Sequence, residues 1–515
     1  MKKKQINNRF SAVTSVIANA TNTFSYAYLP GSGLIATVSN NLEQVVARSY
    51  ETHRDLITSV ENIWGTNIIS RFDYTNDALG RRTARQDAGV AFASTWTNLF
   101  AYNVRSEIEE AIMRNGPSEY EFDPIGNRRE VTLPEEPTPY VYQSNELNQY
   151  TSITNGIASV PIHDEDGNML SGPAGTGHTE LQFAWDGENR LVAVTNGSIV
   201  VLNSYDAQSR WVRKQVLENG SPATDVRFLY DGWSLTRSVT LSNDGASTNF
   251  YTWGLDLSQS VQGAGGVGGL LSVTISTSST NQTYSTCFDA NGNISEYLDL
   301  GTGGIAAHLE YDAFGRTIVS TGTAPCAFGF STKYEDAETG LLYYGYRFYS
   351  PELGRWPSRD PIGEVGGNNL YACCRNDLNN RIDLRGLAYD PYEGFSNAWD
   401  LWGGDDQGGV PEEWGSEWEA NARKKLRATI RDWRKLGYNY AADLMQAFLD
   451  RTGHYSPSQS NIEEVKTHGK SQICKVISKH ACASISKNSG SVYVQISPKD
   501  DNDSNIRWLY IGYNK

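Results

Sequence analysis

The amino-acid sequence predicts a mainly β protein built from many short strands joined by tight turns. The 515 residues include 48 Gly, 29 Tyr and 13 Trp but only 4 Met. Aromatic side chains favour pleated sheet, and glycine allows the backbone conformations that tight turns need. The length allows two or more domains, or one extended array of repeats.

The charge is distributed unevenly along the chain. The net charge is −15, but residues 419–515 hold 16 Lys and Arg against 9 Asp and Glu, which gives +7 there and leaves −22 for the rest. An acidic body with a basic tail is therefore expected. No apolar run approaches the roughly 18 residues that a membrane-spanning helix needs.

The N-terminus and the cysteines give no clear indication of a signal peptide, a disulfide framework or a metal site. The opening "MKKK" is basic and "ANA" (residues 18–20) imitates a cleavage site, but the stretch between them is short and interrupted by Ser and Thr. We therefore find no convincing signal peptide. The six cysteines show no CxxC spacing, so we expect free thiols, no metal site and no cofactor.

Residues 1–320 contain a recurring phrase of an aromatic residue, an Asp, a short gap, Gly or Asn, and Arg. The copies are "FDYTNDALGRRTA" (Phe72–Ala84), "YEFDPIGNRREV" (Tyr120–Val131), "FAWDGENRLVAV" (Phe183–Val194), "YDAQSRWVRKQV" (Tyr205–Val216), "FLYDGWSLTRSV" (Phe228–Val239), "CFDANGNISEY" (Cys287–Tyr297), "LEYDAFGRTIVS" (Leu309–Ser320) and the weaker "IHDEDGNMLSG" (Ile162–Gly172). The Asp side chain can bind backbone amides of the turn, and Gly or Asn can take the positive-φ position. Each unit is a hairpin that cannot bury its own face, so neighbouring units are expected to pair into a continuous sheet.

A second motif follows the repeats. It reads "YEDAETGLLYYGYRFYSPELGRWPSRDPIG" (Tyr334–Gly363) and then "GGNNLYACCRND" (Gly366–Asp377). Together with the repeats it resembles the RHS family, with its YD repeats and RHS repeat-associated core. The resemblance implies a β-sheet spiralled into a hollow shell, a core segment (residues 321–387) that closes one end, and a variable effector after it.

Two acids of this core segment are candidates for catalysis. Asp360 begins "DPIG" and Asp383 begins "DLRG". If the segment folds back, the two carboxylates meet, and one keeps a proton while the other stays a base. Arg359 could hold or orient one of them. From the residues alone, turn capping is the favoured interpretation of both aspartates.

The RHS resemblance implies a role for the pair. It assigns self-cleavage to Asp360 and Asp383, assisted by Arg359, at the bond between Leu387 and Ala388. The sequence departs from the family pattern in two places, because Leu384 replaces a Pro and "RNDLNN" (Arg375–Asn380) alters an Asn-x-Pro. The loss of Pro removes turn rigidity rather than a catalytic group, which leaves the rate of cleavage in question.

After the core segment the composition changes. Residues 388–418 are rich in Asp, Glu, Gly and Trp and contain no Lys or Arg, which indicates an acidic linker. Residues 419–515 predict a small α+β domain, with helical spacing in 419–453 and alternating strands at 491–497 and 506–513. Seven Lys and Arg lie between 423 and 435, so this domain either targets nucleic acid or presents a solvated helix face. Effector candidates are His454, His468, His480 and Glu463, although no metal-ligand spacing links them.

Two functions are consistent with these observations. The first is an RHS-type polymorphic toxin, or a fragment of one, from a bacterium, secreted or at the cell surface. Its shell would hold the C-terminal domain as cargo, and an immunity protein is a possible partner. The alternative is a non-enzymatic YD-repeat protein with a structural or adhesive role. Self-cleavage after Leu387 would serve the first function and has no purpose in the second.

Overall fold

A computed structural model describes residues 12–17, 20–243 and 245–387, together with three strands at 481–488, 491–498 and 507–511. The chain divides into two compact units, 1–404 and 405–515. The predicted boundaries at 387/388 and 418/419 fall at the edge of the described residues or outside them.

The first unit is built from two antiparallel sheets of 14 strands each, and within each sheet every strand pairs with the next one in the chain. The first sheet contains β1 (Ala12–Ile17), β2 (Ala20–Tyr28), β3 (Ile35–Asn40), β4 (Gln44–Tyr50), β5 (Ile57–Trp64), β6 (Asn67–Asn76), β7 (Arg82–Ala88), β8 (Trp96–Tyr102), β9 (Ile108–Met113), β10 (Gly116–Phe122), β11 (Arg128–Thr132), β12 (Tyr140–Ser144), β13 (Tyr150–Asn155) and β14 (Ile157–Ser159). The second contains β15 (Ile162–His163), β16 (Met169–Gly175), β17 (Thr179–Trp185), β18 (Leu191–Asn196), β19 (Ile199–Tyr205), β20 (Trp211–Glu218), β21 (Ser221–Asp231), β22 (Ser234–Ser242), β23 (Gly245–Trp253), β24 (Leu270–Ser276), β25 (Asn281–Phe288), β26 (Ile294–Asp299), β27 (Ile305–Tyr311) and β28 (Thr317–Gly322). A 3₁₀ turn, η1 (Thr176–His178), follows β16. The predicted mainly β fold of paired hairpins is confirmed.

The turn chemistry of the repeats is as predicted. In each of six turns one carboxylate oxygen accepts the backbone N–H groups two and four residues further on, at 2.8–3.0 Å. The capping residues are Asp77, Asp123, Asp186, Asp206, Asp289 and Asp312. Gly80, Gly126, Asn189, Gly292 and Gly315 take the positive-φ position, and in "YDAQSR" Ser209 takes it instead. The copy at Asp231 differs, because Asp231 pairs with Ser234 across a tight turn in which Gly232 has a positive φ.

The recurring Arg connects one repeat to the next. Nε of Arg190 donates to Asp186 at 2.8 Å, and its guanidinium lies 5.4 Å from the ring centre of Tyr205, which ends β19 and begins the next repeat. Arg210 does the same with Asp206 and Tyr230. The aromatic residue, the Asp and the Arg of the phrase therefore form one interaction set that joins neighbouring hairpins.

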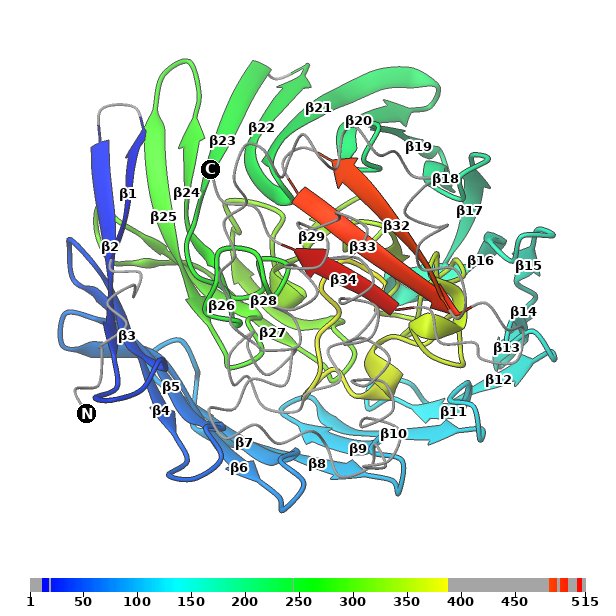
Figure 1. Ribbon diagram of the computed structural model, residues 1–515, viewed down its shortest axis with the longest axis horizontal. Helices are drawn as coiled ribbons and strands as arrows, with labels where there is room; N and C mark the ends of the chain where they lie inside the picture. Colours follow the sequence, from blue (N-terminus) through cyan, green and yellow to red (C-terminus); the bar gives the residue numbers. More distant parts are fainter. Residues whose placement is uncertain are drawn as a thin grey trace, which may run out of the picture. The chain divides into compact units, whose positions relative to one another are not determined.

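The end of the second sheet packs on the beginning of the first. Side chains of the first sheet bind the later strands, as when Nδ2 of Asn62 donates to the carbonyl of Phe288 at 3.0 Å and Oγ of Ser70 donates to Glu296 at 2.6 Å. In β24 and β26 consecutive residues are buried, whereas β8 and β17 alternate. Strands covered on both faces lose alternation. In Figure 1 the strands follow one another around the unit until β24 and β25 return to the region of β1–β5.

The core segment is largely irregular and lies against many strands. It contains η2 (Phe330–Thr332), β29 (Tyr334–Asp336), β30 (Leu341–Tyr343), β31 (Phe348–Tyr349), η3 (Gly363–Val365) and η4 (Cys374–Asn376). Its contacts reach from β7, where the amide of Arg82 donates to Asn380, to β20, where the amide of Trp211 donates to the Tyr343 hydroxyl. Most of its buried hydrophobic side chains belong to the same hydrophobic cluster as those of the repeats.

The second unit is described only in a three-stranded sheet, β32 (Ala481–Asn488), β33 (Ser491–Pro498) and β34 (Arg507–Ile511), paired in that order. The last two match the predicted strands, and β32 was not predicted. The expected helices at 419–453 and the candidates His454, His468, His480 and Glu463 lie outside the described residues. Among the described residues, no helix is long and apolar enough to cross a membrane.

Candidate active site

Asp360 and Asp383 meet at one guanidinium group. Nη2 of Arg347 lies 2.8 Å from Oδ2 of Asp360 and 3.8 Å from Oδ2 of Asp383, and all three side chains are buried. Arg347 directly precedes β31, whereas Asp383 follows Ile382, which is anchored in a small apolar cluster. The folding back of the segment, which the sequence suggested, thus brings both carboxylates to one place.

Arg347 is held from every side. Its Nε donates to the carbonyl oxygen of Gly386 at 2.6 Å and its Nη1 to that of Leu370 at 3.1 Å. The guanidinium also lies 4.2 Å from the ring centre of Trp356. Burial lowers the pKa of Arg347, and the two carboxylates oppose that effect. A planar group with this many contacts fixes the positions of the carboxylates it binds.

Asp383 accepts hydrogen bonds from the residues that lead to the expected cleavage site. We call residues 383–387 the cleavage segment. Oδ1 of Asp383 accepts the amides of Arg385 at 3.1 Å, Gly386 at 2.6 Å and Leu387 at 3.1 Å. Asp360 likewise uses Oδ1 to accept the amide of Ile362 at 3.0 Å. Each aspartate therefore caps a turn with one oxygen and directs the other toward Arg347, so turn capping and a catalytic role are compatible.

The carbonyl oxygen of Leu387 lies beside Asp360. The two groups meet at Gly366, where a Cβ would come within 2.5 Å of the Leu387 oxygen and would also collide with Oδ2 of Asp360. Oδ2 of Asp360 and the carbonyl oxygen of Leu387 therefore border the same small space beside Gly366, next to the bond between Leu387 and Ala388. General acid catalysis requires the acid to come within hydrogen-bond reach of the carbonyl oxygen, and Asp360 is a neighbour of that oxygen in the fold.

The environment of Asp360 favours its protonated form. Burial raises the pKa of Asp360 to about 6; Arg347 and the amide of Ile362 oppose the rise, whereas Asp383 adds to it. Burial also raises the pKa of Asp383, against Arg347 and three backbone amides. An acid poised near neutral pH beside a carbonyl is suited to proton donation.

Gly366→Ala is expected to slow any reaction at Leu387 by about tenfold or more, because the methyl group would separate the Asp360 carboxyl from the carbonyl. The backbone of Gly366 is helical, with φ −78° and ψ −15°, so Ala causes no backbone strain. Gly187→Ala is the matched control, since no atom lies within 4 Å of its added Cβ. Equal cleavage rates in the two variants, followed by gel after cell-free synthesis, would contradict this geometry.

Arg359 does not reach the carboxylates in the way that the sequence suggested. Its side chain is exposed, and its aliphatic carbons lie over Gly167 beside the hydroxyl of Tyr371. Neighbouring residues in an extended chain point in opposite directions, so adjacency to Asp360 was a poor guide. The sequence carried another signal, because a charge within the aromatic run "LLYYGYRFY" is expected to be buried and paired. That charge is Arg347.

Leu387 is the last described residue before the proposed cut, and Ala388 lies outside the described residues. In the part of the chain that the structure describes, no group of three or more His, Cys, Asp or Glu could hold a metal ion. The four described cysteines, Cys287, Cys326, Cys373 and Cys374, are free thiols.

Comparison with known proteins decides the family. The family model named Teneurin YD-shell matches residues 42–371, which is more than half of the chain. The chain belongs to the teneurin YD-shell family. The resemblance to RHS and YD-repeat proteins is thereby confirmed.

Relatives of this YD-shell protein include bacterial proteins named as nucleases and as toxin subunits. It is 28% identical over 295 residues to the tRNA3(Ser)-specific nuclease WapA of Bacillus spizizenii, covering 53% of this chain and 11% of the relative. It is 40% identical over 102 residues to the toxin subunit YenC1 of Yersinia entomophaga, covering 19% and 10%. The chain thus spans about a tenth of the length of these relatives.

A solved structure supports the fold. A chain in the crystal structure of TcdB2-TccC3-Cdc42 superimposes with a TM-score of 0.60 at 17% identity, covering 73% of the YD-shell protein and 20% of that chain. At this identity the likeness concerns the fold alone, which is that of a β-shell.

Proposed function

We propose that the YD-shell protein is an RHS-type polymorphic toxin, or a piece of one, whose core segment cuts its own chain between Leu387 and Ala388. The observation that carries the proposal is the position of the Asp360 carboxyl beside the Leu387 carbonyl, with Arg347 between Asp360 and Asp383. The toxin relatives support the biological role, and the geometry supports the chemistry.

The reaction is a hydrolysis with two aspartates in different states. Asp360, protonated, donates to the carbonyl oxygen of Leu387, while Asp383 accepts a proton from a water molecule that attacks the carbonyl carbon. The carbon–nitrogen bond then breaks, and a proton passes to the amine of Ala388. Leu387 is left as a carboxylate. Arg347 keeps both carboxyl groups in place and offsets the negative charge that develops.

The cleavage rate is expected to fall as pH rises through about 6, because burial raises the pKa of Asp360 to that value and the acid form is lost above it. The single-turnover rate of the refolded chain, measured across acidic and neutral buffers, checks this. A rate that rises through the same range would assign the base role to Asp360 instead.

The released part, residues 388–515, would be the cargo of the shell. Its net charge from 419 onward is +7 against an acidic remainder, which favours an anionic target such as nucleic acid. An immunity protein and a secreted or cell-surface location are further parts of this proposal. His454, His468, His480 and Glu463 remain the candidates for its activity.

An N-terminally tagged chain tests cleavage and retention together. Captured under native conditions, it should carry the C-terminal fragment with it, and denaturant should release that fragment from the tag. A fragment that washes off without denaturant would contradict enclosure. A single uncut chain would favour a non-enzymatic structural or adhesive role.

A further inference from the structure

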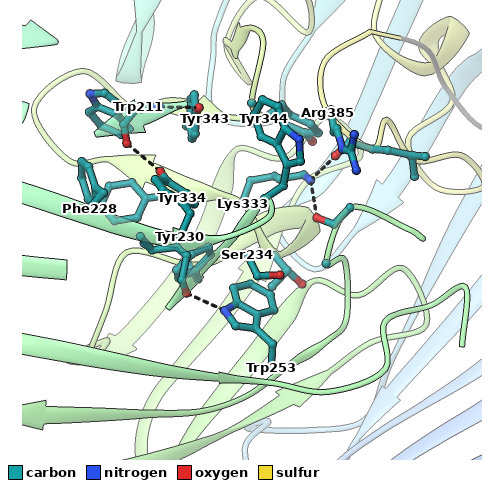
Figure 2. Close-up of a pocket in the computed structure, with 18 residues that line it drawn as sticks. Trp211, Phe228, Tyr230, Ser234, Trp253, Lys333, Tyr334, Tyr343, Tyr344 and Arg385 are labelled. Atoms are coloured by element: carbon teal, nitrogen blue, oxygen red, sulfur yellow. Dashed lines mark hydrogen bonds between the residues drawn. The ribbon is translucent and has the colours of Figure 1, made fainter. Parts of the chain in front are cut away.

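Lys333 contacts the cleavage segment at Leu384. Its Nζ donates to the carbonyl oxygen of Leu384 at 2.9 Å and to that of Gly265 at 3.3 Å. Figure 2 shows the amine between Tyr344 and Arg385, with both hydrogen bonds. The ammonium also lies 4.9 Å from the ring centre of Tyr344.

The two carbonyl oxygens that follow Leu384 are also bound. That of Arg385 accepts the amide of Tyr346 at 2.9 Å, and that of Gly386 accepts Nε of Arg347 at 2.6 Å. The next carbonyl oxygen, that of Leu387, lies with the Asp360 carboxyl beside Gly366. A shift by one residue would place a different carbonyl at Asp360, so these contacts define which bond can react.

Lys333 differs from the other buried lysine of this region. Lys214 pairs directly with the carboxylates of Asp336 and Glu338. Among the described ion pairs none includes Lys333, which is 5% exposed and donates to two peptide carbonyls. A buried ammonium without a carboxylate in contact costs stability, and such a cost is common where function requires the group.

The lowered pKa of Lys333 is consistent with a cost in stability from burying its charge. Burial lowers the pKa of Lys333 to about 8; Asp383 and Asp256 oppose the fall, as does Cys374, whereas Arg385 adds to it. A lysine whose folded-state pKa is below its unfolded value destabilises the fold at neutral pH, where the folded chain must hold the proton. Removal of the amine should therefore not weaken the shell.

We propose that Lys333 is a positioning residue that sets the register of the cleavage segment, so that the carbonyl of Leu387 faces Asp360. This role rests on the proposed self-cleavage. It also accounts for the tolerance of Leu384 where the family pattern has Pro, since the Lys333 hydrogen bond and the apolar contacts of Leu384 with Leu257 and its neighbours replace the rigidity of the ring.

The first test measures rate and stability together in the full chain. Lys333→Met should slow cleavage by about 10²-fold while the unfolding temperature stays equal or rises. Lys333→Arg, which keeps a donor and a charge, should recover part of the rate. Lys214→Met should lower the unfolding temperature and keep the rate. An unchanged rate in folded Lys333→Met, or an equal slowing in Lys214→Met, would overturn the role.

The second test is independent of cleavage. In an Asp360→Asn background, hydrogen exchange at the amides of Arg385, Gly386 and Leu387 should become faster on adding Lys333→Met and not on adding Lys214→Met. Unchanged protection would overturn the positioning role even if the protease is real. Faster exchange with a wild-type chain that stays whole would instead refute only the protease.

Discussion

Arg347→Met is expected to slow self-cleavage by about 10²-fold or more, whereas Arg359→Met keeps nearly the wild-type rate. Arg347 bridges Oδ2 of Asp360 and Oδ2 of Asp383 and also holds the carbonyl of Gly386. Its loss leaves two buried carboxylates without their common cation and frees the cleavage segment. Arg359 is exposed, and its aliphatic carbons lie over Gly167.

Arg347→Lys keeps this prediction testable if the Met variant does not fold. Lysine retains the charge but cannot reproduce three directed hydrogen bonds from one planar group, so the rate should still be reduced strongly. The measurement is the fraction of intact chain against time after cell-free synthesis. Normal cleavage in folded Arg347→Lys, or loss of cleavage in Arg359→Met, would show that the wrong arginine has been assigned.

Trp211→Ala is expected to lower the free energy of unfolding of the shell by about 3–5 kcal/mol. Trp211 is 1% exposed at the start of β20, and its ring contacts the ring of Phe228 on β21. It also contacts three rings of the core segment, those of Tyr334, Tyr343 and Phe348. The substitution therefore leaves a cavity where repeats and core segment join.

Trp96→Ala is the matched control, because Trp96 is 38% exposed on β8 and its loss should change the free energy by about 0.5 kcal/mol or less. Denaturant unfolding followed by circular dichroism compares the two variants. Similar midpoints for both would mean that the core segment contributes little to holding the shell together.

The sequence predicted the repeats well because their determinants are local. An Asp such as Asp186 caps its own turn through amides two and four residues away, and Asn189 supplies the positive φ within the same turn. Hairpins with such turns are expected to pair with their neighbours in the chain. The chain order of the strands within each sheet could therefore be predicted. The packing of β24–β26 on the first sheet was not readable in detail, because it depends on pairs more than 200 residues apart, such as Asn62 and Phe288.

Only the part of the candidate site that depends on local sequence could be predicted. The two aspartates stand at recognisable turns, whereas Arg347 and Lys333 reach the site only through the fold of the whole core segment. Gly366 gave no signal at all, since its backbone is ordinary and its importance lies in the two oxygens beside it. Adjacency in sequence favoured Arg359 as the arginine that holds the aspartates. Proximity in the structure favours Arg347 for that role.

Intact mass under denaturing conditions tests the central claim most directly, with the wild-type chain measured beside Asp360→Asn and Asp383→Asn. These substitutions keep the shape of each side chain and remove its acid–base chemistry. We expect two wild-type fragments that meet between Leu387 and Ala388, and one whole chain in each variant. A whole wild-type chain, or fragments that persist in both variants, would contradict an aspartyl self-cleavage at this site.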